Sequence, residues 1–209
     1  MASNNIDDSG RIILGSGDLY IVEFTGEIPE WSAIEKEENR AGNIKSGATV
    51  EYSQTSQTVK DDKGRVKKTI VTEEDVKFKT GLITWVQNYI KALISTARVD
   101  TTSKPGHRVY KIGGLANQNK TRYLWHFVHT YDDGRKLRVT VTGKNTGTVT
   151  LAFKPEDATQ VDAEITANTL DKDGTLIIID DEMLENDPDY TAPAEQQSDD
   201  GTQENGEEA

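Results

Sequence analysis

The chain has 209 residues, of which 34% are hydrophobic and 29% are charged, and it contains no cysteine. This length and apolar content fit one domain of ordinary size with polar extensions, and the lack of cysteine excludes disulfides, thiolate nucleophiles and Cys-based metal sites. The first residues lack the basic and apolar segments of a signal peptide, and no apolar stretch has the length of a membrane span. We therefore expect folding in a cytoplasm and no membrane partner.

The net charge of −12 is concentrated at the C-terminal end, where no Lys or Arg follows Lys172. Twelve of the 36 acidic residues lie in residues 180–209, so the other 24 balance the 24 Lys and Arg of the preceding chain. A neutral body argues against tight binding of nucleic acid, which requires a net basic surface. Any contact with DNA is expected to be non-adhesive.

We divide the chain into an N-terminal arm over residues 1–11, a β-domain over 12–184 and an acidic tail over 185–209. The tail is rich in Asp, Glu, Gln, Ser, Pro and Gly, so it buries too little apolar surface to offset the entropy of ordering it. We expect it to be disordered and to form a solubilising fringe, with a negative lining of a channel as the alternative.

Near the start of the β-domain, Gly15-Ser16-Gly17 precedes an expected strand over residues 18–24. A glycine loop that cradles phosphate leads into a helix, so we interpret this one as a turn. Residues 28–43 follow, with Trp31 and Ile34 among many charges and without strand periodicity. This composition fits an ordinary long loop whose apolar residues join the core, and it equally fits a loop that contacts another molecule.

A long hairpin is predicted over residues 44–79, where two strand-like runs flank a turn at Asp61 to Gly64. The outgoing run is polar on both sides beyond Tyr52. The return run places its apolar residues on one face: Val66, Ile70, Val76 and Phe78. Such a hairpin has little core of its own and leaves its strand edges available. It is either a mobile surface flap or an arm that pairs with another subunit.

One amphipathic helix is predicted after the hairpin, because apolar residues recur there at spacings of three and four. They are Leu82, Trp85, Val86, Tyr89, Ile90, Leu93 and Ile94. Thr80 is the expected N-cap, and the helix should end over residues 95–98, before the Pro105-Gly106 break.

The later part of the chain alternates apolar and polar residues with a period of two, which predicts strands. The apolar faces are Leu137, Val139 and Val141, then Val149, Leu151 and Phe153, then Val161, Ala163 and Ile165. Arg138, Thr140 and Thr142 are expected on the opposite side of the first strand. Turns are predicted at 132–134, 143–145 and 171–174. Many strands with one helix predict a mainly β fold, an antiparallel β-sandwich or barrel flanked by one α-helix.

The three histidines do not form a predicted site. His126 and His129 lie an odd number of residues apart on an expected strand, so their side chains point to opposite faces and do not share a metal. With His107, we interpret them as ordinary polar or half-buried residues. No nucleophile, metal or cofactor pattern stands out elsewhere, so we predict neither an enzyme nor a bound cofactor.

The aromatic residues Tyr123, Trp125 and Phe127 share one face of an expected strand. Aromatic side chains aligned in this way stack on bases in some nucleic-acid binding proteins. No basic groove accompanies them here, so packing in the core is the favoured interpretation.

A family resemblance rests on several tracts in a fixed order between Ile12 and Ile179. They are Leu14-Gly15-Ser16-Gly17-Asp18-Leu19-Tyr20, Glu23-Phe24, Glu37-Glu38-Asn39-Arg40, Gly42-Asn43-Ile44-Lys45-Ser46-Gly47-Ala48, Thr69-Ile70-Val71-Thr72-Glu73-Glu74, the stretch from Gly81 to Arg98, Lys111-Ile112-Gly113-Gly114, Leu151-Ala152-Phe153, Asp162-Ala163-Glu164 and Gly174-Thr175-Leu176-Ile177-Ile178. Together they resemble the major tail tube proteins of tailed bacteriophages and related phage-like particles. The acidic end from Glu185 is not part of the resemblance.

The resemblance implies a structural virion protein whose homohexameric rings stack into a hollow tail tube, the conduit for DNA ejected into the host. The long hairpin would contribute to an inner β-barrel shared between subunits. Implied partners are other copies of the chain, the tail terminator, the tape measure and distal tail or baseplate proteins, with assembly in the host cytoplasm. The alternative is a monomeric β-sandwich that serves as a binding or decoration module.

The resemblance also suggests residues for two roles. Contacts between subunits or rings are expected from the 28–43 loop and the hairpin tip: Trp31, Ile34, Asp61, Asp62, Lys63, Gly64 and Arg65. Candidates to face the lumen are polar residues of the hairpin and of a later strand: Glu51, Ser53, Glu73, Asp75, Asp162 and Glu164.

Overall fold

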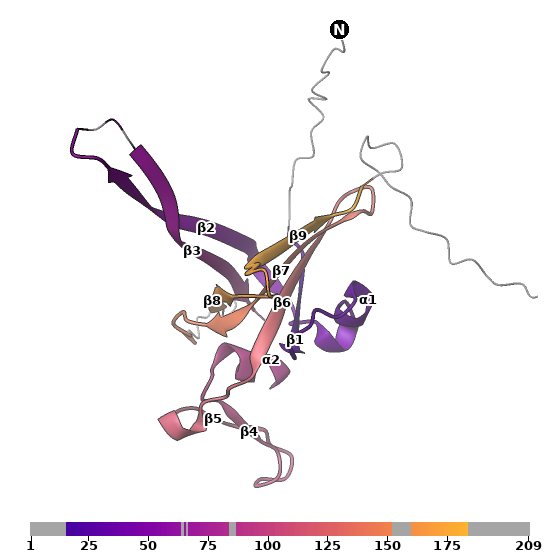
Figure 1. The fold of residues 1–209 in the computed structure, drawn as a ribbon. Coiled ribbons are helices and arrows are strands. Elements are labelled where there is room, and N and C mark those ends of the chain that lie inside the picture. Colours follow the sequence, from indigo (N-terminus) through magenta and orange to yellow (C-terminus); the bar gives the residue numbers. More distant parts are fainter. Residues whose placement is uncertain (1–15, 64, 66, 84–86, 152–159, 184–209) are drawn as a thin grey trace, which may run out of the picture.

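The protein is described by a computed structural model over residues 16–63, 65, 67–83, 87–151 and 160–183 (Figure 1). Its elements in chain order are β1 (Asp18–Phe24), α1 (Trp31–Ile34), η1 (Glu37–Asn39), β2 (Ile44–Lys60), β3 (Lys67–Leu82), α2 (Gln87–Leu93), β4 (Arg98–Asp100), β5 (Val109–Lys111), η2 (Leu115–Asn117), β6 (Arg122–Thr130), β7 (Lys136–Asn145), β8 (Val161–Asn168) and β9 (Ile177–Asp181). The predicted mainly β, antiparallel fold is confirmed. The N-terminal arm and the acidic tail lie outside the described residues.

The strands form one seven-stranded antiparallel sheet and a separate β4–β5 pair. The order in the large sheet is β1-β6-β7-β8-β3-β2, and β9 also pairs with β7. Strand β7 has two partners on the same side, because residues 137–141 pair with β9 and residues 142–145 pair with β8. The sheet therefore divides along β7 into a β9 branch and a branch that carries the β2–β3 hairpin.

The main core lies on one face of the sheet, which we term the core face, where α2 packs. Alternation explains its membership, since Val76 and Phe78 of β3 and Ala163 and Ile165 of β8 point to the same side. Trp125 is fully buried among them, and its indole N–H donates to the Gly143 carbonyl at 3.3 Å. The prediction that the aromatic residues of this strand pack in the core is confirmed.

The opposite face of the sheet, the second face, is covered over only part of its area. Segment 28–43, which contains α1, packs against β1, β6 and β7, where Phe24, Ile34, Leu124 and Leu170 form a smaller buried cluster. Over β8, β3 and β2 the same face carries polar residues. Because the covering segment is short, one sheet face has a buried half and an open half.

The helix prediction is correct in place but wrong at its start. Helix α2 is described over Gln87–Leu93, and Tyr89 and Leu93 join the core as the apolar spacing predicted. Thr80 is not an N-cap, because β3 continues to Leu82 through its pairing with β8. The Thr80 hydroxyl instead donates to the Gly47 carbonyl at 3.2 Å.

Two predictions near residue 145 are wrong. Residues 148–151 form no strand, and Phe153 lies outside the described residues. Residues 143–145 are not a turn but the end of β7. Gly143 is required there for close packing, since a Cβ would lie 2.2 Å from the Thr166 carbonyl oxygen. The turns at 132–134 and 171–174 are confirmed, with Gly134 at φ 90° and Gly174 at φ 85°.

The predicted hairpin is confirmed over β2 and β3, but its apolar side is interrupted. The register shifts between the Thr55–Glu73 and Ser56–Val71 pairs, so Thr72 is an extra residue in β3. This bulge moves Ile70 to the face opposite Val76 and Phe78, and it puts Val71 on their face instead. The predicted single apolar face is therefore wrong for Ile70, and Val66 lies outside the described residues.

Candidate functional site

The most distinctive surface belongs to the β2–β3 ribbon, the part of the hairpin that extends beyond the rest of the sheet (Figure 1). β8 pairs with β3 only along Lys77–Leu82, so residues 67–76 pair only with β2 among the described strands. The outer edge of β2 has no partner strand in the described part of the chain. A two-stranded ribbon with open edges on both sides has little stability of its own, so a partner strand would stabilise it.

All the predicted lumen residues lie on the open half of the second face. The register aligns Glu51 with Lys77, Ser53 with Asp75, Thr55 with Glu73, Lys79 with Glu164 and Gly81 with Asp162. Directly opposed residues of antiparallel strands project to the same side. The structure thus brings together Glu51, Ser53, Glu73, Asp75, Asp162 and Glu164, although they come from three strands.

This polar face is predominantly negative. Over residues 49–55, 73–79 and 162–166 it carries five carboxylates and two lysines, Lys77 and Lys79. Both lysines are paired, since Lys77 lies 3.1 Å from Glu164 and Lys79 lies 2.7 Å from Glu51. The hydrogen bond to Glu51 raises the pKa of Lys79 above its ordinary value. Neither lysine is therefore free to hold a phosphate group.

The core face of the ribbon carries exposed apolar side chains farther out, which we term the apolar stripe, although Gln54 and Glu74 interrupt it. Val76 and Phe78 are buried, but Val50, Tyr52 and Val71 farther out are 37%, 55% and 50% exposed. The Tyr52 hydroxyl donates to Glu74 at 2.7 Å, which holds the ring on the ribbon surface. An exposed apolar stripe opposite a polar face is typical of a strand pair that packs against another chain.

The predicted contact residues at the hairpin tip are exposed or partly exposed. The Asp61 carboxylate lies 3.4 Å from Arg65 Nε, in an exposed ion pair. Asp62 and Lys63 are exposed, and Gly64 lies outside the described residues. Pairs of this kind contribute at most about 1 kcal/mol each to stability, so the tip by itself adds little to the stability of the ribbon.

The other predicted contact residues have roles inside the chain. Ile34 is fully buried between α1 and the sheet, so it offers no surface to another subunit and belongs to the core. Trp31 is half-buried, stacks on His126 with ring centroids 5.0 Å apart, and donates its indole N–H to Asp180 at 2.5 Å. Only the part of Trp31 that remains exposed is available for the predicted contact with another subunit.

Under segment 28–43 lies a buried cluster of charged groups that the sequence interpretation missed. Glu35 accepts hydrogen bonds from Lys136 and Arg138, both at 2.5 Å. Arg138 is 8% exposed and also pairs with Glu182 at 2.6 Å. Burial alone would raise the pKa of Glu35, but these two donors lower it below its ordinary value. The signal in the sequence is the polar Arg138-Thr140-Thr142 side of β7, which alternation places opposite Leu137, Val139 and Val141.

His126 is the least satisfied member of this cluster. It is fully buried, its Nδ1 lies 2.8 Å from the Thr140 hydroxyl, and its Nε2 lies 3.5 Å from Glu35, too far for a strong hydrogen bond. Burial lowers the pKa of His126 to about 4, although the nearby Glu35 opposes this shift. His126 lies on a strand, as predicted, but it is fully buried and therefore deeper than the polar or half-buried position that the sequence predicts.

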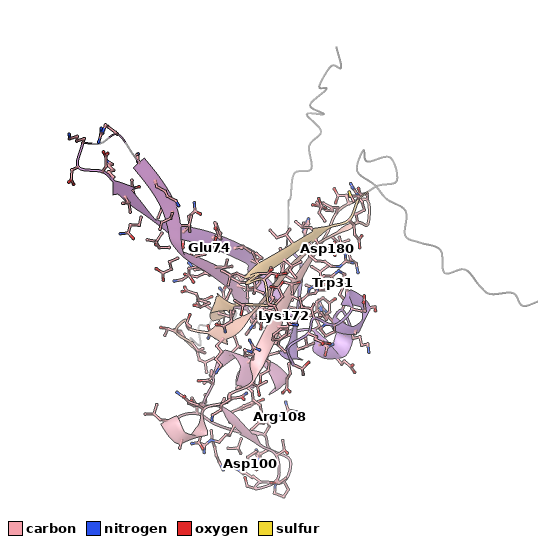
Figure 2. All side chains as sticks on the ribbon, viewed as in Figure 1. Trp31, Glu74, Asp100, Arg108, Lys172 and Asp180 are labelled. Atoms are coloured by element: carbon pink, nitrogen blue, oxygen red, sulfur yellow. The ribbon has the colours of Figure 1, made fainter. Side chains whose placement is uncertain are left out.

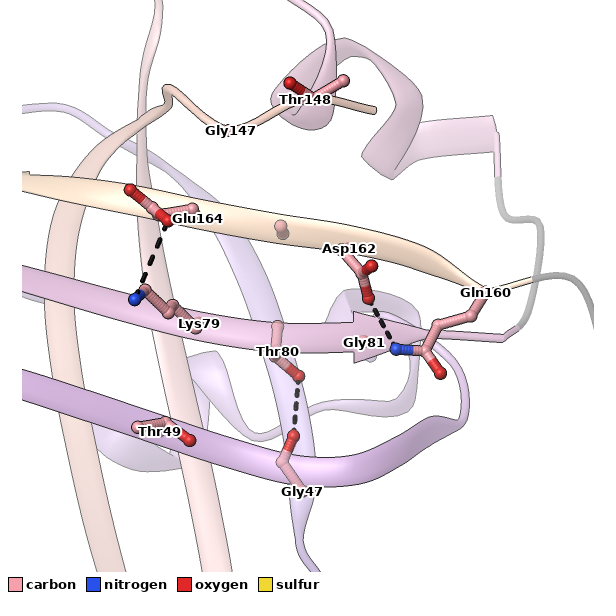
Figure 3. A pocket seen from close by; sticks show the side chains of 11 residues that line it. Gly47, Thr49, Lys79, Thr80, Gly81, Gly147, Thr148, Gln160, Asp162 and Glu164 are labelled. Atoms are coloured by element: carbon pink, nitrogen blue, oxygen red, sulfur yellow. Dashed lines mark hydrogen bonds and ion pairs between the residues drawn. The ribbon is translucent and has the colours of Figure 1, made fainter. Parts of the chain in front are cut away.

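An open hollow of about 320 Å³ lies on the polar face near the base of the hairpin (Figure 3). Its lining includes Thr49, Lys79, Gly81, Asp162 and Glu164, and residues 147–148 border it. Asp162 accepts a hydrogen bond from Gln160 at 2.5 Å, which leaves one carboxylate oxygen toward the opening. The hollow is open to solvent, and its lining combines carboxylates, a lysine and threonines with a larger share of apolar surface.

Among the described residues, no three His, Asp or Glu side chains are grouped closely enough to hold a metal ion. No helix in the described ranges has the length and apolar character required to cross a bilayer. No protein-family model matches the sequence, and no curated protein matches it either.

Proposed function

We propose that this chain is a structural subunit of a phage tail tube, assembled as stacked homohexameric rings around a channel for DNA. The observation that carries the proposal is the two-faced β2–β3 ribbon. Its second face gathers the polar residues Glu51, Ser53, Glu73 and Asp75, and its core face carries the exposed apolar side chains Val50, Tyr52 and Val71. The family resemblance of the sequence supports the same assignment.

In the proposed ring, the open ribbon edges pair with ribbons of neighbouring subunits, and the apolar stripe is covered by the adjoining protein. Closure into a barrel removes every unpaired edge, which an isolated ribbon does not achieve. The sheet would then present its polar face to the lumen. The rest of the antiparallel sheet and the flanking α2 would form the wall outside this inner barrel.

The charge of the polar face suits a channel for DNA. Five carboxylates and two paired lysines repel phosphate groups and provide no free cation to bind them. A basic lining would instead hold DNA by release of counterions and so slow its passage. The proposed partners are other copies of the chain, the tail terminator, the tape measure and distal tail or baseplate proteins. Assembly would occur in the host cytoplasm, and the finished location is the virion.

Electron microscopy of the concentrated full-length protein tests this proposal. We expect hollow tubes built of rings with six-fold symmetry, with the β2–β3 ribbon lining the channel. Hydrogen exchange gives a second measurement, since residues 49–58 should become protected when the tubes form. A protein that stays monomeric at every concentration, and that enters no tube in a phage particle, would contradict the proposal.

The alternative is a monomeric β-sandwich module that binds or decorates a phage particle. The hollow of about 320 Å³ lined by Thr49, Asp162 and Glu164 favours this alternative, because a depression of this size at the base of the hairpin offers room for a ligand. The two functions differ in the consequence of filling the hollow. Gly147→Trp should block a ligand of a monomeric module without affecting the free ribbon edges, whereas tube formation depends on those edges.

A further inference from the structure

A compact basic lobe projects from the end of the molecule that carries β4 and β5 (Figures 1 and 2). We define it as residues 98–121, which include β4, β5 and η2. It contains five Lys and Arg residues and a single acidic residue, Asp100, in a chain whose net charge is −12. The basic members are Arg98, Lys104, Arg108, Lys111 and Lys120.

The only carboxylate of the lobe neutralises just one of these cations. Asp100 lies 3.0 Å from Lys111 Nζ and accepts the backbone N–H of Ser103 at 3.0 Å. Hydrogen bonds from Ser103 hold the pKa of Asp100 well below its usual range, so it remains a fixed anion. Lys104, Arg108 and Lys120 are exposed, and no carboxylate in the described ranges lies within 4.0 Å of their charged nitrogens.

The lobe also exposes apolar side chains beside its charges. Leu115 is 84% exposed, the highest value among the exposed large hydrophobic residues described, and Ile112 is 53% exposed. Gly113 and Gly114 have φ of 110° and 86°, so the backbone turns there in a conformation that glycine favours and presents Leu115 outward. A lobe that combines exposed cations with an exposed leucine suits a partner that is acidic and carries some apolar residues.

The chain contains a segment with that composition. Residues 184–209 carry nine Asp and Glu residues and no Lys or Arg, together with Leu184 and Tyr190. The described chain reaches this segment just after β9, which lies at the opposite end of the molecule from the β4–β5 pair (Figure 1). Copies stacked head to tail would bring the β9 end of one subunit near the basic lobe of the next.

We propose that the basic lobe binds the acidic segment 184–209 of a second copy of the chain, as a clasp between successive subunits. The inference rests on the proposed function for the head-to-tail arrangement, and on charge complementarity for the choice of partner. A 26-residue segment has a reach of about 85 Å when extended, which is long enough to span a subunit interface. The contact should weaken with salt, because its ion pairs are exposed.

Cross-linking of full-length protein tests the clasp. Isotopically light and heavy copies are mixed in equal amounts, concentrated for assembly and treated with a carbodiimide, which joins lysines directly to carboxylates. We expect links from Lys104 and Lys120 to carboxylates of residues 184–209, with mixed-isotope pairs as frequent as same-isotope pairs. Same-isotope pairs alone would show contact within one chain, and absent links would show no contact; either result overturns the proposal.

Charge reversal supplies the matched comparison. The double variant Lys104→Glu with Arg108→Glu should lose the links at Lys120. The control Lys36→Glu with Lys172→Glu makes the same change in net charge at exposed positions outside the lobe, and should keep them. Equal loss in both variants would mean a general charge effect and would overturn the clasp. Tubes without these links would overturn the clasp alone, whereas links between copies without tubes would contradict the proposed function alone.

Discussion

At the scale of single residues, Glu35 holds segment 28–43 on the sheet. Its carboxylate is 10% exposed and accepts hydrogen bonds from Lys136 and Arg138. Glu35→Gln should lower the free energy of unfolding by about 3 kcal/mol, because it leaves Arg138 with less compensation for its burial. Urea denaturation measures the change. Glu37→Gln, an exposed neighbour of the same chemistry, should change stability by less than about 0.5 kcal/mol, and equal effects would contradict this account.

His126 makes stability depend on pH. Burial lowers its pKa from 6.5 to about 4, so below pH 6.5 the unfolded chain binds a proton that the folded chain does not. Stability is therefore complete above pH 6.5 and falls as the pH drops toward 4, by about 2 kcal/mol between pH 7 and pH 5. His126→Gln should remove this part of the difference, measured by denaturation at both pH values. His107→Gln, at an exposed site, should retain it, and a full pH dependence in both variants would contradict the assignment.

At the scale of elements, the β2–β3 ribbon has two faces with separate roles in the proposed assembly. Tyr52→Ser with Val71→Ser should raise the concentration needed for polymerisation at least tenfold, which corresponds to about 1.4 kcal/mol of lost burial per contact. Both side chains are at least half exposed in the single chain, so its unfolding free energy should change by less than about 1 kcal/mol. Sedimentation gives the polymerisation threshold, and denaturation gives the stability.

The control for this experiment uses the opposite face of the same ribbon. Ser53→Ala with Thr55→Ser removes one heavy atom from each of two side chains on the polar face of β2. It should leave the polymerisation threshold unchanged, since residues that face the proposed lumen would meet water and not another subunit. If both pairs of substitutions change the polymerisation threshold equally, assembly does not depend on one face more than on the other, and the ribbon is a surface flap.

At the scale of the whole molecule, the negative polar face should keep DNA from adhering in the channel. Each subunit now has five carboxylates and two lysines on this face. Glu73→Lys with Asp75→Lys changes this to three carboxylates and four lysines. Tubes polymerised with short duplex DNA should then retain nuclease-protected DNA, and retention should fall steeply with salt. Glu37→Lys with Glu38→Lys, an equal change of charge on η1, should protect none. Equal protection by both variants would place the polar face outside the channel.

Local sequence patterns were sufficient to predict several elements correctly. The alternation over residues 161–165 predicts the buried and exposed sides of β8 correctly, and Gly134 marks the β6–β7 turn. The hairpin was visible because two strand-like runs flank a turn, and all six lumen candidates share one face because side chains alternate along strands in register. These features depend on neighbours along the chain or across a tight hairpin, which the sequence itself specifies.

Other features depend on contacts between distant parts of the chain. The same alternation leaves open what covers each side of a strand, so Arg138 and Thr140 are buried only because segment 28–43 packs over β7. From the sequence, Gly143 predicts a turn, but in the structure it is needed because β8 approaches the backbone closely there. The bulge at Thr72 places Ile70 on the opposite face from the predicted one. By itself the sequence determined the β class, the hairpin and the distribution of charge. Tertiary structure decided which faces are covered, because burial depends on partners far away in the chain.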